Sequence, residues 1–125
     1  MQKTLDFNEV FQFMKKFSVD YVNRFGEMII DHKTNIYLPL SECKDLADIE
    51  AWSVFVLCRP IGKGLEDKDA KRLLKRVNAY FETELTQEDM CTMYGELCYR
   101  DKLGEFKDFI KRGFPMDQLK GEEIK

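Results

Sequence analysis

The chain has 125 residues, of which 44% are apolar and 34% are charged, and its formal net charge is −3. This length is that of one domain, so we expect residues 1–125 to form a single domain with a frayed polar tail at 119–125. The acidic balance gives no general attraction to phosphate backbones or anionic membranes. Direct nucleic-acid binding is therefore disfavoured.

Cysteine usage and hydropathy indicate the compartment. The four cysteines lack paired spacing, and the first residues lack the apolar run of a signal peptide. The longest nearly apolar run, residues 51–58, is far shorter than the roughly 20 residues that cross a bilayer. We expect reduced thiols, a cytoplasmic location and no membrane partner.

The first predicted element is a helix over residues 7–25, because apolar residues recur there at spacings of three and four. Asp6 is placed to cap its start, and Gly26 can adopt the left-handed conformation beyond its end. The face expected to be buried consists of Phe7, Val10, Phe11, Met14, Phe17, Tyr21, Val22 and Phe25.

A β-hairpin is predicted next. Two short β-prone runs, 28–30 and 36–38, flank the polar residues 31–35. Pro39 suits an edge strand or a strand end, because proline has no amide hydrogen to donate to a sheet.

Two helices are predicted after the hairpin. Ser41 is placed to cap a short one ending at Leu46, and Asp48 to cap a longer one over 49–59 that Pro60 stops. Residues 51–58 are apolar almost all round, which fits a buried helix or a buried strand, and the preceding acidic residues favour the helix.

In the second half of the chain, the apolar spacing and the capping signals predict helices only. A loop at 61–64 precedes an amphipathic helix over 65–83, and Thr86-Gln87-Glu88-Asp89 has the form of a capping box that opens another. A last helix carries the apolar residues of 103–110. The predicted fold is mainly α, a compact bundle of about five helices with a short β-hairpin, and it is α+β if the hairpin forms.

Residues 85–95 resemble the opening of a repressor-type helix-turn-helix, in which a turn glycine follows a small residue by four positions. Gly95 follows Cys91 in this way. In that family an apolar residue comes after the glycine, whereas Glu96 stands here and residues 97–99 continue the first helix. Alternating charges beyond it would largely cancel phosphate attraction. A DNA-binding regulator using residues 86–112 is the second hypothesis.

Two charged groups are candidate partner-binding surfaces. Basic residues form a stripe on the helix over 65–83, opposite its apolar face, and could dock an acidic partner or RNA, although such a stripe is usually a solvated face. Acidic residues gather over 82–89 and could occupy a basic nucleic-acid channel of another protein. The candidates are Lys68, Lys71, Arg72, Lys75, Arg76, Glu82, Glu84, Glu88 and Asp89.

Catalytic and cofactor signals are weak. His32 is the single histidine, no serine or cysteine lies in a nucleophile motif, and Gly62-Lys63-Gly64 is too short for a phosphate-binding loop. We therefore expect no enzyme and no cofactor. His32 and Cys43 are candidate zinc ligands, because imidazole and thiolate are preferred zinc donors, and a zinc-stabilised module is the third hypothesis.

In overall type, the chain resembles small proteins of phages and mobile elements of low-GC bacteria, and among them anti-CRISPR proteins. The shared features are short length, acidity, abundant lysine and phenylalanine, and no catalytic signature. The resemblance spans the chain without a diagnostic motif, so it transfers no site residue and leaves partner and oligomeric state open. It implies a protein-binding inhibitor or adaptor in a bacterial host, occupying a surface of a nucleic-acid-processing effector complex.

Overall fold

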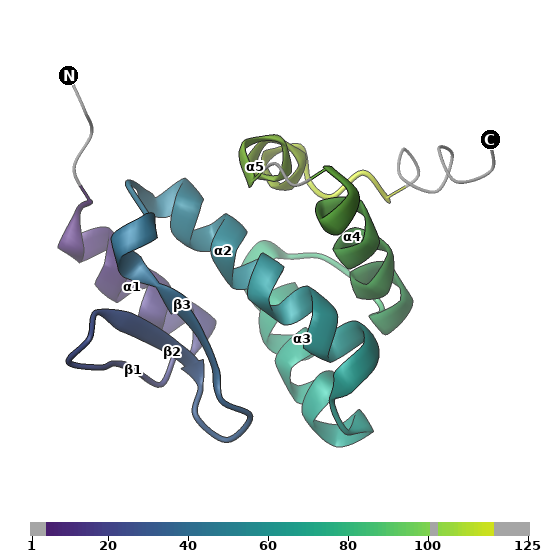
Figure 1. The fold of residues 1–125 in the computed structure, drawn as a ribbon, viewed down its shortest axis with the longest axis horizontal. Helices are drawn as coiled ribbons and strands as arrows, with labels where there is room; N and C mark the ends of the chain where they lie inside the picture. The colour runs from purple at the N-terminus through teal and green to yellow at the C-terminus, as the bar shows by residue number, and fades with distance from the viewer. Residues whose placement is uncertain (1–4, 101–102, 117–125) are drawn as a thin grey trace.

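The computed structural model describes residues 5–100 and 103–116, which contain five α-helices and a three-stranded antiparallel sheet (Figure 1). The mainly helical fold with a short hairpin is thereby confirmed. The expected tail at 119–125 lies outside the described residues. In chain order the elements are α1 (Phe7–Phe17), β1 (Tyr21–Val22), β2 (Glu27–Asp31), β3 (Ile36–Pro39), the 3₁₀ turn η1 (Leu40–Glu42), α2 (Leu46–Arg59), the π-helical turn η2 (Pro60–Gly64), α3 (Asp67–Phe81), α4 (Gln87–Arg100) and α5 (Leu103–Lys111).

Helix α1 starts at the predicted cap, where the Asp6 carboxylate accepts a 2.9 Å hydrogen bond from the Asn8 amide, but it ends earlier than predicted. Ser18 adopts a left-handed conformation with φ 64°, and its amide donates to the last carbonyls of the helix. Tyr21 and Val22 then form β1, since aromatic and β-branched residues pack well in strands. The prediction of a helix as far as residue 25 was wrong, and the positive φ of Gly26 serves the β1–β2 turn instead.

The predicted buried face of α1 was also partly wrong. Val10, Phe13 and Phe17 are buried, whereas Phe7 is 68% exposed and Phe11 is 61% exposed. The buried residues form a narrow stripe at spacings of three and four, because α1 meets α3 and α2 along one line. Phe7 and Phe11 lie to one side of that line.

The sheet has the order β1-β2-β3, and every neighbouring pair is antiparallel. The predicted hairpin is confirmed as β2 and β3, and Pro39 stands at the end of the edge strand β3, where its missing amide hydrogen costs no ladder bond. Met28, Ile30 and Leu38 face the core. One face of the sheet is thus buried against the helices.

Helix α2 crosses the middle of the molecule (Figure 1). It contacts β3, α4 and α5, which explains why residues 51–58 are apolar almost all round and confirms the helical alternative. Its cap is Asp45, whose carboxylate accepts a 3.0 Å bond from the Asp48 amide. The predicted cap at Asp48 and the predicted helix from Ser41 to Leu46 were therefore wrong, because Asp45 has an extended backbone and η1 replaces the short helix.

The segment after Pro60 is a π-helical turn, not the predicted loop. Gly62 lies directly against α4, since a Cβ built on it would come within 2.9 Å of the Cys91 backbone.

The capping box of α4 is confirmed, with Thr86 and Asp89 exchanging hydrogen bonds of 3.1 and 2.9 Å. As expected, α4 continues through Gly95 without a helix-turn-helix break.

Buried residues from α1 to α5 and from the sheet join in a hydrophobic cluster. Within the described ranges, none of the helices combines the length and apolar composition that a bilayer crossing requires. The described elements therefore pack around a shared core, and the surfaces they leave exposed are the candidates for function.

Candidate interaction surface

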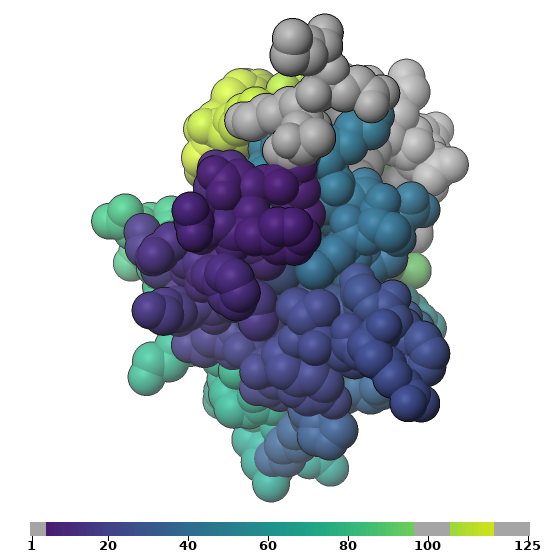
Figure 2. Space-filling model, turned by 90° about the vertical axis from the view of Figure 1, so that its left-hand side faces the viewer, coloured from purple at the N-terminus to yellow at the C-terminus, as the bar shows by residue number. Residues whose placement is uncertain are grey.

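Large hydrophobic side chains are exposed at one end of the molecule. In the described part of the chain all of them belong to residues 7–37, on α1, β1, the β1–β2 turn and β3. Figure 2 looks onto this end, where α1 and the sheet residues lie side by side. We call the following six side chains the apolar end: Phe7, Phe11, Tyr21, Val22, Phe25 and Tyr37.

The outer face of the sheet carries a row of apolar residues across its strands. Tyr21 pairs with Ile29, and Ile29 pairs with Tyr37. Ile29 is 7% exposed yet stands outside the core cluster, because strand alternation turns it away from the neighbouring core residues. The two half-exposed tyrosines flank it, so this face is covered by the protein's own aromatic rings.

The tip of the hairpin is tied to β1 by polar contacts. The Tyr21 hydroxyl lies 3.3 Å from His32 Nδ1, and the His32 amide donates a 2.6 Å hydrogen bond to the Asp20 carboxylate. These bonds hold the short strand β1 against the longer hairpin formed by β2 and β3. They also give His32 a structural role at an exposed position.

Three cations stand beside the apolar end. Lys15, Lys16 and Arg24 are exposed, and none of them has an ion-pair partner among residues 5–100 and 103–116. The Arg24 guanidinium lies 5.0 Å above the centre of the Phe25 ring, a cation–π arrangement. This surface therefore combines aromatic side chains with charges of both signs, because Asp6 and Asp20 are exposed on it as well.

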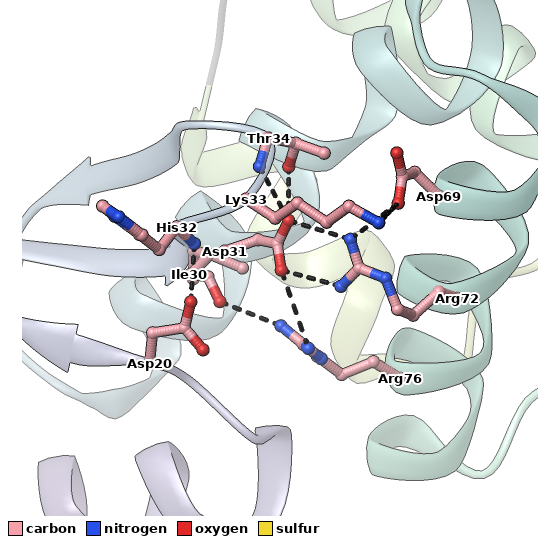
Figure 3. A network of polar contacts seen from close by, with 9 residues as sticks. All are labelled: Asp20, Ile30, Asp31, His32, Lys33, Thr34, Asp69, Arg72 and Arg76. Atoms are coloured by element: carbon pink, nitrogen blue, oxygen red, sulfur yellow. Dashed lines mark hydrogen bonds and ion pairs between the residues drawn. The ribbon is translucent and has the colours of Figure 1, made fainter.

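A buried ionic network fixes the hairpin to α3 (Figure 3). The Asp31 side chain is only 4% exposed and accepts hydrogen bonds of 2.7 and 3.0 Å from Arg72. Thr34 donates to the same carboxylate, and Arg76 donates a 2.9 Å bond to the Ile30 carbonyl. The Arg72 guanidinium holds the pKa of Asp31 well below its usual range, although burial opposes it.

Asp69 extends this network along α3. It accepts a 3.0 Å bond from Arg72 and lies 3.3 Å from the Lys33 ammonium group of the hairpin turn. Positive and negative side chains of the hairpin and of α3 thus alternate where the hairpin meets the helix. The network sets the orientation of the sheet, and so the position of the apolar end, relative to the helices.

The predicted basic stripe is divided by this network. Arg72 and Arg76 contact the hairpin, while Lys68, Lys71 and Lys75 remain exposed on α3. Lys71 pairs with the equally exposed Asp67 at 3.0 Å. Arg72 and Arg76, both predicted to bind a partner, therefore serve to hold the hairpin on α3.

The predicted acidic residues gather on another part of the surface. Glu82, Glu84 and Asp89 line an open depression of about 300 Å³ together with Phe114. Glu88 is exposed but does not line it. The structure thus brings together three of the four acidic candidates.

The two candidate zinc ligands are far apart along the fold. His32 lies in the hairpin turn before β3, and Cys43 follows the other end of that strand, where burial raises the pKa of its thiol to about 12. Among the described residues, no group of three or more His, Cys, Asp or Glu side chains is arranged to hold a metal ion.

Sequence reasoning missed the apolar end, although a signal for it is present. Four phenylalanines occur within the eleven residues of α1, more than one narrow contact line can bury.

Comparisons with protein-family models, curated proteins and solved structures found no match. Evidence on function therefore comes from the surface of the chain itself.

Proposed function

We propose that the protein is a protein-binding inhibitor or adaptor and that the apolar end contacts its partner. The supporting observation is the exposure of large aromatic side chains at one end, with Phe7 at 68% and Phe25 at 73%. Covering such a side chain contributes about 1.5–3 kcal/mol, and aromatic anchors dominate many protein interfaces. An apolar surface left to water without a partner would favour aggregation.

The narrower form of the proposal concerns the partner. The resemblance in type to anti-CRISPR proteins suggests a nucleic-acid-processing effector complex of a bacterial host. Binding would act by occupying a surface that the complex needs, which requires no catalytic group. Direct DNA reading is not proposed, because α4 lacks the turn at Gly95 on which that hypothesis depends.

An affinity capture tests the proposal. The tagged chain is incubated with a bacterial lysate, with and without nuclease, and the retained proteins are quantified by mass spectrometry. A variant with Phe7→Ser and Phe11→Ser removes two exposed rings, and Lys68→Ser with Lys75→Ser changes two exposed positions of α3 as the matched control. Circular dichroism checks that all three chains are folded.

We expect a stoichiometric, nuclease-resistant partner that the wild type and the control retain and the phenylalanine variant loses. Retention through nucleic acid alone would contradict protein binding. Equal capture by the phenylalanine variant would contradict the assignment of the apolar end, while leaving a protein partner established.

A further inference from the structure

We draw no further inference here: the strongest candidate, the surface patch of the apolar end on α1, β1, the β1–β2 turn and β3, is flanked by charges of both signs, and nothing in the part of the chain that the structure describes shows what covers it.

Discussion

Replacing Asp31 by asparagine tests whether the ionic network holds the hairpin on α3. The change keeps the shape of the side chain and removes the charge that Arg72 contacts at 2.7 and 3.0 Å. A hydrogen bond to a charged group contributes about 1.5–3 kcal/mol. The Arg72 side chain is 36% exposed and can be hydrated again, so we expect a total loss of about 2 kcal/mol rather than the sum of two bonds.

Urea denaturation measures this loss. With a slope of about 2 kcal/mol per molar urea, the midpoint of unfolding should fall by about 1 M. The matched control is Asp67→Asn, which removes an exposed carboxylate paired with Lys71 and should cost less than about 1 kcal/mol. If Asp31→Asn costs no more than this control, the network does not stabilise the junction as we describe.

The same variant should change the dependence of stability on pH. The pKa of Asp31 is lowered in the folded protein, chiefly by the Arg72 hydrogen bonds. Its stabilisation is therefore fully present above the unfolded pKa of about 3.9 and is lost as the pH falls through the folded value. Wild type should lose stability more steeply than Asp31→Asn below about pH 5, and parallel pH profiles would contradict this cause.

Two further substitutions test local packing and capping. Gly62→Ala should cost about 1–3 kcal/mol in denaturant unfolding, because its Cβ would lie 2.9 Å from the Cys91 backbone, whereas Gly64→Ala meets no atom within 4 Å and should cost less. An equal effect of both would show that contact with α4 is not the reason. Thr86→Ala should cost about 1 kcal/mol, since it removes the 3.1 Å bond to the Asp89 amide, and an unchanged melting midpoint would contradict the capping role.

Local signals predicted much of the fold because the interactions behind them are local. The capping box at Thr86 and Asp89 is complete within one helical turn, and the β2–β3 hairpin joins residues close in the chain. Helix α2 was recognised from its acidic start, although its cap lies at Asp45 and not at Asp48. Boundaries differ by a few residues because several neighbouring side chains could serve as the cap.

The errors arise where distant segments decide the outcome. Helical spacing continues through Tyr21 and Val22, but pairing with β2 draws these residues into a strand. Phe7 and Phe11 have the composition of core residues, and only the line along which α1 meets α3 leaves them exposed. The contact of Arg72 with Asp31 joins residues 41 positions apart, which no local pattern reveals.

The apolar end as the partner-binding face is the central claim, and hydrogen exchange of the chain alone and in complex with its captured partner tests it most directly. We predict slower exchange of backbone amides in α1, β1 and β3 on binding, with little change on the exposed side of α3. Protection around residues 82–89 or on α3, with α1 and β1 unchanged, would contradict the account.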